Sequence, residues 1–153
     1  MELSIIFLPL IASIISGFFG KFIGDRNSEI VTSVLVSISA LLSIFVLYQV
    51  IVNQYEENII IATWINSGSL DVNWSMLIDP LSAVMLVVVT SVSSLVHIYS
   101  IGYMSHDPHK PRFMAYLSLF TFAMLMLVTS DNFVQLFFGW EGVGLCSYFL
   151  IGF

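Results

Sequence analysis

Five long apolar stretches, separated by polar segments, dominate the pattern along the chain. Each stretch is close to the roughly 20 residues that an α-helix needs to cross about 30 Å of hydrocarbon. Residues that start or cap helices stand in the polar breaks, with Pro111 before the fourth stretch and three candidate N-caps at 130–132 before the fifth. The pattern therefore predicts five transmembrane helices, at about residues 4–24, 30–52, 77–101, 113–130 and 133–153.

The longest polar section, between the second and third stretches, has a strand-like pattern. Residues 59–65 are mostly β-branched or aromatic, residues 66–68 have the Asn-Ser-Gly composition of a turn, and polar and apolar residues alternate beyond it. This pattern predicts a β-hairpin over about residues 59–75, at the outer membrane surface, where Trp64 and Trp74 suit the interface. The alternative is an irregular interfacial loop.

Composition decides the class of protein. Hydrophobic residues make up 58% of the 153 residues and charged residues only 9%, whereas soluble domains carry about 25% charged residues. So few charges cannot cover a water-facing surface, which excludes a soluble globular protein. We expect an all-α membrane protein in contact with the lipid bilayer, in which residues 1–153 form a single membrane domain. It has five transmembrane helices and a short extracytoplasmic β-hairpin between helices 2 and 3.

Net charge and cysteine content narrow the chemistry. The net charge of -6 leaves no basic patch to neutralise a phosphate backbone, which excludes nucleic-acid binding. The single cysteine, Cys146, cannot form an intrachain disulfide or supply the ligands of an iron–sulfur cluster or structural zinc. His106, Asp107 and His109 superficially resemble a metal site, but the neighbouring prolines and the lack of further ligands favour a solvated loop. We therefore expect no cofactor or metal bound by this chain.

The four basic residues predict the orientation in the membrane. Lys21 and Arg26 flank the first turn, and Lys110 and Arg112 the third. Alternate turns lie on the same side, and the positive-inside rule places both in the cytoplasm or matrix. The N-terminus, the hairpin and the turn at 130–132 then face the opposite side.

Glu141 is the carboxylate that stands out, because it lies about eight residues inside the fifth apolar stretch. A charge at that depth costs about 2.5 kcal/mol or more on insertion scales, and such residues usually mark ion or proton pathways. The alternative is a protonated carboxyl that only hydrogen-bonds a neighbouring helix. Gly139, Gly142 and Cys146 form a small-residue stripe that predicts a helix-packing face, so we expect the adjacent Glu141 to point into a protein interior. Neither lysine of the chain is placed to pair with it.

His97 is a second candidate for proton transfer, near the inner end of the third stretch and close to Tyr99 and Tyr103. An imidazole with an ordinary pKa of about 6.5 can relay protons. The alternative is an interfacial or hydrogen-bonded structural histidine.

Three motifs carry a resemblance to a known family. Residues 139–153, with the sequence Gly-Trp-Glu-Gly-Val-Gly-Leu-Cys-Ser-Tyr-Phe-Leu-Ile-Gly-Phe, resemble the fifth transmembrane helix of the antiporter-like chain 5 (subunit L) family of respiratory complex I, NADH-quinone oxidoreductase. Residues 79–82 and 97–104, which open and close the third stretch, are similar to the same family. The resemblance implies that Glu141 matches a glutamate that pairs with a lysine two helices later and passes protons along a polar axis.

This resemblance implies a membrane-arm subunit of a proton-pumping NADH:quinone oxidoreductase, located in the bacterial or mitochondrial inner membrane. Its partners would be the other membrane subunits of complex I, while flavin and iron–sulfur clusters would belong to other subunits. The fifth stretch stops at Phe153 without a polar flank, so we expect a truncated fragment of a longer subunit. A second chain supplying the remaining helices and a non-functional remnant are both open alternatives.

A component of a multisubunit cation/proton antiporter is the alternative function. That family shares the Trp-Glu pair, but it usually has Leu after the Glu, whereas Gly142 follows Glu141 here. A membrane protein that only packs against partners is a third possibility.

Overall fold

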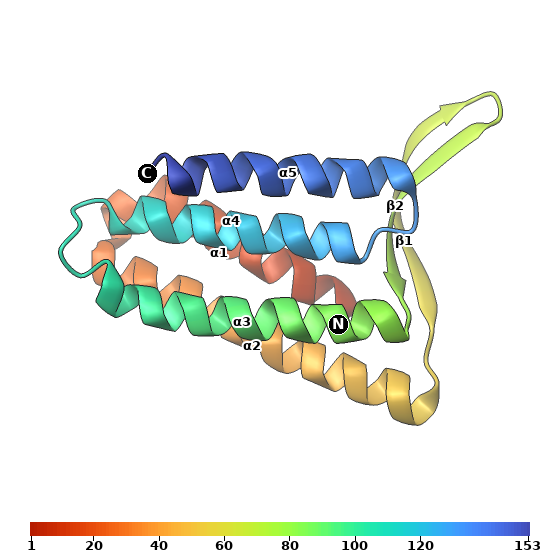
Figure 1. The fold of residues 1–153 in the computed structure, drawn as a ribbon, viewed down its shortest axis with the longest axis horizontal. Coiled ribbons are helices and arrows are strands. Elements are labelled where there is room, and N and C mark those ends of the chain that lie inside the picture. The colour runs from red at the N-terminus through yellow and green to blue at the C-terminus, as the bar shows by residue number, and fades with distance from the viewer.

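The computed structural model describes residues 1–153 as five helices and one β-hairpin (Figure 1). All five helices are long and apolar enough to cross a membrane, so the predicted all-α membrane fold with a hairpin between helices 2 and 3 is confirmed. The elements are α1 (Glu2–Ile23), α2 (Asp25–Asn53), β1 (Glu57–Ser67), β2 (Leu70–Ile78), α3 (Pro80–Tyr103), α4 (Lys110–Val128) and α5 (Phe133–Ile151).

The start of α2 differs from the prediction. The helix begins at Asp25, five residues before the expected start at 30, because α1 and α2 are joined by Gly24 alone. Gly24 has a φ of 86°, a left-handed value that glycine adopts without strain. The polar residues 25–28, expected to form the turn, therefore form the first helical turn of α2.

The expected start of the third helix at 77 is also wrong. Strand β2 continues to Ile78, and α3 begins at Pro80 behind an Asp79 cap. The Asp79 carboxylate accepts from the Ser82 amide at 2.7 Å, and the Ser82 hydroxyl accepts from the Asp79 amide at 2.8 Å. This capping box, with proline in the first turn, defines the boundary more sharply than the apolar run does.

A proline marks the start of α4, and a capping side chain marks the start of α5. Helix α4 starts at Lys110, three residues before the expected 113, with Pro111 in the first turn, where a missing N–H is tolerated. Helix α5 starts at Phe133, and of the three candidate caps it is Asn132 that accepts from the Gln135 amide, at 2.8 Å.

The helices lie side by side, with the hairpin at one end of the bundle (Figure 1). Helix α1 packs against α2 and α4, α2 packs against α3, and α4 packs against α5. The main hydrophobic cluster lies toward the hairpin end and draws on every element except β1 and α5. Its members are Ile5, Ile6, Val46, Val50, Met76, Ile78, Ala83, Leu86, Leu125 and Met126.

The hairpin is regular enough to exclude the irregular-loop alternative. Strands β1 and β2 pair antiparallel from Ser67 opposite Leu70 to Glu57 opposite Ile78, with two register shifts. Trp64 and Trp74 stack at 4.8 Å between ring centroids. Phe138 of α5 meets the Trp74 ring edge-on at 4.9 Å, so the hairpin packs against the start of the last helix.

Candidate functional site

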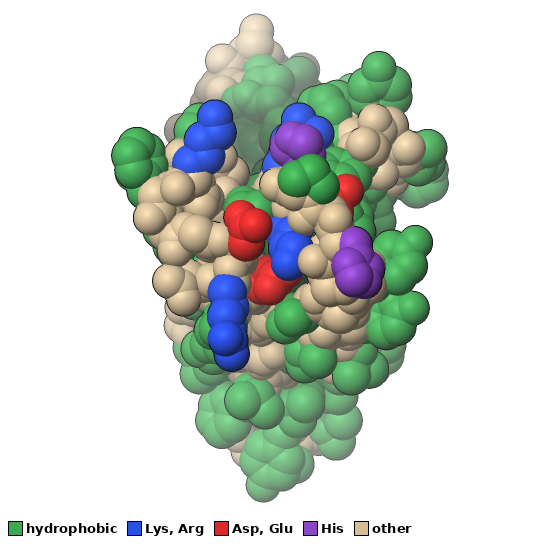
Figure 2. Space-filling view, turned by 90° about the vertical axis from the view of Figure 1, so that its left-hand side faces the viewer, with side chains coloured by type: hydrophobic (Ala, Val, Ile, Leu, Met, Phe, Trp, Pro, Cys, Tyr) green, Lys and Arg blue, Asp and Glu red, His purple; other side chains and the backbone are tan.

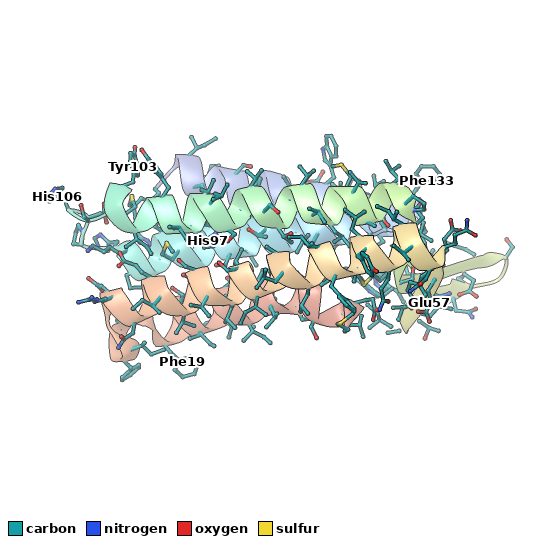
Figure 3. The ribbon with its side chains drawn as sticks, turned by 90° about the horizontal axis from the view of Figure 1, so that it is seen from below. Phe19, Glu57, His97, Tyr103, His106 and Phe133 are labelled. Atoms are coloured by element: carbon teal, nitrogen blue, oxygen red, sulfur yellow. The ribbon has the colours of Figure 1, made fainter.

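His97 lies fully buried within the bundle, in the half of α3 that is nearer the α3–α4 connection (Figure 3). Its Nδ1 is 2.8 Å from the Ser93 carbonyl and its Nε2 is 3.0 Å from the Ser118 hydroxyl of α4. A carbonyl only accepts, so Nδ1 donates to it, and in the neutral ring Nε2 then accepts from Ser118. The predicted neighbours Tyr99 and Tyr103 are exposed and stack on each other instead, at 5.7 Å.

Hydroxyl groups extend this site along α3. Ser93 hydrogen-bonds Thr121 of α4, next to the histidine ring. Toward the hairpin end, two further hydroxyl pairs join α3 to α2. The Ser94 and Ser37 oxygens are 2.8 Å apart, and the Thr90 and Ser43 oxygens are 2.7 Å apart. Imidazole and hydroxyl groups both donate and accept, so this arrangement can hold or pass a proton. We name the set His97, Ser93, Ser118 and Thr121 the His97 cluster.

Sequence reasoning identified His97 but missed its partners. The available signal was the spacing of Thr90, Ser93, Ser94 and His97, which places polar side chains on one side of a helix. The pairings themselves join residues that are 21 to 57 positions apart in sequence. Such partners depend on how the helices pack, which local spacing does not reveal.

Helix α5 packs on α4 through the predicted small-residue stripe. A Cβ added to Gly139 would lie 2.8 Å from the Cα of Leu127, and one added to Gly142 would lie 3.2 Å from the Cβ of Ala123. Cys146 on the same stripe is buried, 2% exposed. The predicted helix-packing face is therefore confirmed, and its partner is α4.

Glu141 lies at the middle of α5 but is exposed. At about 100° per residue, its side chain points some 130° away from the stripe that faces α4. The expectation that Glu141 points into a protein interior is therefore wrong within these five helices. The structure also keeps the two predicted site residues apart, because α4 packs between α3, which carries His97, and α5 (Figure 1).

A buried ion pair escaped the sequence prediction. Glu29 was expected just before the second helix, but it lies within α2 and is only 5% exposed, with its carboxylate 3.9 Å from the Lys110 ammonium of α4. One Glu29 carboxylate oxygen and the nearby Ser33 hydroxyl have no hydrogen-bond partner in the chain. The ion pair was not predicted because the second helix was expected to begin at 30, after Glu29.

All four basic residues gather at the end of the bundle formed by the α1–α2 and α3–α4 connections (Figure 2). Asp25, Glu29 and Asp107 lie at the same end. The Arg112 guanidinium lies 5.2 Å from the centre of the Phe153 ring, a cation–π distance. The opposite end, which carries the hairpin, has no lysine or arginine.

Hydrogen bonds hold the hairpin end to the start of α5. The buried Gln135 side chain accepts from the Ser75 amide at 3.0 Å and donates to the Ser75 carbonyl at 2.7 Å. The Asp131 carboxylate accepts from the side-chain amide of Asn58 at 2.9 Å. Partial burial raises the pKa of Asp131, but hydrogen bonds from the Asn58 and Asn132 side chains and from the backbone outweigh it and hold the pKa below its ordinary value.

Comparison with known proteins finds a matching family model and similar full-length relatives. The family model described as "NADH-Ubiquinone oxidoreductase (complex I), chain 5 N-terminus" matches residues 64–114. The chain is 58% identical over 153 residues to NADH-ubiquinone oxidoreductase chain 5 of Arabidopsis thaliana, and 49% identical over 153 residues to that of Aspergillus niger. Both alignments cover 100% of this chain and 23% of the relative, so the chain spans about a quarter of the length of these relatives. This multi-pass membrane protein is therefore similar, along its whole length, to the N-terminal region of NADH-ubiquinone oxidoreductase chain 5.

Proposed function

We propose that this chain forms part of a membrane-arm subunit of a proton-pumping NADH:quinone oxidoreductase. The high identity to chain 5 relatives along the whole chain supports this assignment. In this proposal the chain lies in a mitochondrial or bacterial inner membrane beside other membrane subunits. NADH oxidation, with its flavin and iron–sulfur chemistry, belongs to other subunits. The basic end faces the matrix or cytoplasm, and the N-terminus and hairpin face the opposite side.

Glu141 is the proposed proton-transfer carboxylate, and its placement is the observation that carries the proposal. It lies mid-way along a membrane-spanning helix, and the packing of Gly139 and Gly142 on α4 aims it outward. A carboxylate facing lipid at that depth is costly, so its exposed face calls for polar protein neighbours. Lys21 and Lys110 both lie at the basic end, and neither forms an ion pair with Glu141. The cation that would tune its proton affinity therefore comes from outside these 153 residues.

His97 is the proposed second relay group. Its ring bridges a backbone carbonyl and a hydroxyl. A proton passed to Nε2 by Ser118 would give an imidazolium, provided that the Ser118 oxygen takes a replacement proton from the next donor in the relay. Release of the same proton would restore the neutral ring and the starting hydrogen bonds. The hydroxyl pairs that continue along α3 offer the next donors and acceptors.

The proposal is tested with Glu141→Gln in the complete subunit within the assembled complex. We expect NADH-driven proton pumping to fall by about a hundredfold or more, because a positioned proton-transfer group typically contributes about 10²–10⁴-fold. Glu141→Asp should retain part of the activity. Assembly should be unchanged, because glutamine keeps the volume of the side chain. Glu57→Gln, which removes an exposed carboxylate at the hairpin end, is the matched control. Normal pumping by an assembled Glu141→Gln complex would make the carboxylate structural.

A further inference from the structure

A polar cavity of about 410 Å³ opens at the basic end, between the end of α1 and the start of α4. Lys21 and Asp25 line one side and His109 and Arg112 the other, so the walls come from both connections at this end. None of these residues belongs to the His97 cluster or lies near Glu141. The cavity is therefore a separate feature of the bundle.

Small residues on α1 create this hollow. Gly20 lies so close to α4 that an added Cβ would lie 2.5 Å from the Cβ of Pro111. The Ser16 hydroxyl donates to the Pro111 carbonyl at 2.6 Å, which fixes the two helices at the same point. Gly17 is exposed, and an added Cβ would only touch Ala115, at 3.5 Å. The missing side chain at Gly17 therefore leaves open space beside a rigid helix contact.

The charges around the cavity favour an anion. Lys21 and Arg112 contribute two positive charges, and Asp25 is the only carboxylate in the lining. Arginine binds phosphate oxygens with a planar pair of N–H donors, and lysine adds a point charge. The Phe153 ring beneath the Arg112 guanidinium restrains it, which lowers the entropy cost of binding.

The position of the cavity indicates which anion it meets. Ile14, Phe18 and Lys21 are four and three residues apart, so they form one exposed row on α1. Lys21 lies at the membrane-surface end of this row, and Phe18 and Ile14 continue it into the hydrocarbon region. Phe18 is 79% exposed and Ile14 is 43% exposed. A ligand in the cavity thus has basic groups at the membrane surface and an apolar helix face directly below them. A phospholipid has the same arrangement of phosphate and acyl chain.

We propose that this cavity binds the phosphodiester headgroup of an anionic phospholipid. Lys21 and Arg112 contact the phosphate from α1 and α4, and one acyl chain lies along Phe18 and Ile14. Basic pockets between membrane helices are suited to such headgroups. Asp25 opposes the bound anion and sets an upper limit on affinity. The lipid holds α1 and α4 together at their membrane-surface ends.

The test is a titration of the purified full chain in detergent with dioleoylphosphatidylglycerol, followed by native mass spectrometry. Lys21→Gln and Arg112→Gln should each weaken binding about fivefold, the effect of one basic residue near an anionic lipid surface. Arg26→Gln is the matched control, because Arg26 is exposed at the same end but does not line the cavity. Asp25→Asn should strengthen binding, which is the opposite sign from the two basic variants.

The competing outcomes are separable. Equal weakening by Arg26→Gln would show diffuse surface attraction and would overturn the site. Equal binding of dioleoylphosphatidylcholine, unaffected by the variants, would overturn the requirement for an anionic lipid. Saturation by inorganic phosphate without binding of the lipid would identify a free-phosphate site instead. If Arg112→Gln alters thermal unfolding, Lys21→Gln and the charge-neutral Gly17→Leu, which fills the hollow, carry the test. Unchanged lipid binding in both would overturn the proposal.

Discussion

His97 and Glu141 are both ionisable side chains within apolar helices, but they differ in burial and in the polar partners that the five helices provide. His97 is 0% exposed, and both of its ring nitrogens have hydrogen-bond partners within the chain. Glu141 is exposed on α5 and takes part in none of the ion pairs of the chain. The environment of His97 is complete in these residues, whereas that of Glu141 is open on one side.

The difference follows from the neighbours of each helix. Helix α3 packs against both α2 and α4, so the polar groups on its packed side meet polar groups of both helices. Helix α5 packs against α4 and touches β2 near its start, which leaves its remaining surface uncovered. A buried polar group needs a hydrogen-bond partner within the chain, whereas an exposed polar group can bind a partner from outside the chain. We therefore expect substitutions at His97 to affect folding and substitutions at Glu141 to affect function.

The largest expected effect is that of His97→Ala on stability. Removal of the ring leaves a cavity and deprives the buried Ser118 hydroxyl of its partner, and the Ser93 carbonyl loses the additional bond from the ring. Together these changes should lower the free energy of unfolding by about 3 kcal/mol. Unfolding of the chain in mixed detergent–dodecyl sulfate micelles, followed by circular dichroism, measures the change. His106→Ala in the exposed α3–α4 connection is the control and should stay within about 0.5 kcal/mol of the wild type. Equal stability of the two variants would remove the contrast.

A somewhat smaller loss is expected when the contact between α5 and α4 is overfilled. In Gly139→Val the new Cβ would lie 2.8 Å from backbone and side-chain atoms of Leu127, so α5 has to move. Overpacking of this kind costs about 2 kcal/mol. Gly144→Ala is the matched control on the same helix, because an added Cβ there meets nothing within 4 Å. The same unfolding assay should find the control at least as stable as the wild type, since alanine favours a helix over glycine. A normal Gly139→Val protein would contradict the close α4–α5 contact.

The prediction of the fold succeeded where the deciding signal is local. Hydrophobic stretches of spanning length, turn residues and a stripe such as Gly139, Gly142 and Cys146 are readable within one segment. They predicted the five helices, the hairpin and the face of α5 that meets a neighbour. The exposed state of Glu141 was not predictable in this way, because burial depends on which helices surround the other faces of α5.

Long-range polar contacts were also beyond the sequence. Gln135 reads as an ordinary residue of an apolar helix, but its amide pairs with the backbone of Ser75, 60 residues away. Glu29 was expected outside the second helix, but Gly24 alone connects α1 to α2, so Glu29 lies within α2. The partner of Gln135 depends on how the segments pack, and the burial of Glu29 depends on where α2 begins. Residue type alone specifies neither the packing nor the helix boundary.

Acid should weaken the link between the hairpin and α5 by a smaller amount. The pKa of Asp131 is lower in the folded chain than its ordinary value of 3.8. A depressed pKa means that the carboxylate stabilises the fold at pH values above its ordinary pKa, and that this contribution is lost as the pH falls through the lower, folded value. Because Asp131 is exposed, the loss should be well below 1 kcal/mol. Unfolding of wild type and Asp131→Asn compared from pH 6 to about pH 3 should show the gap between them closing in acid. A constant gap would contradict the shift.

The smallest effect is expected for Glu141→Gln on the stability of the chain. The carboxylate is exposed and has no ion-pair partner in the chain, so the substitution removes no contact that holds the five helices together. Glutamine also fits the same exposed helical position, with a similar helix propensity. The free energy of unfolding in detergent should therefore change by less than about 0.5 kcal/mol, in the assay in which His97→Ala loses several times more. The Glu141→Gln comparison is informative because the same substitution is expected to reduce proton pumping strongly in the complete subunit. A marked loss of stability in the isolated chain would show that Glu141 contributes to the packing of α5, and any loss of pumping would then need to be separated from a loss of structure.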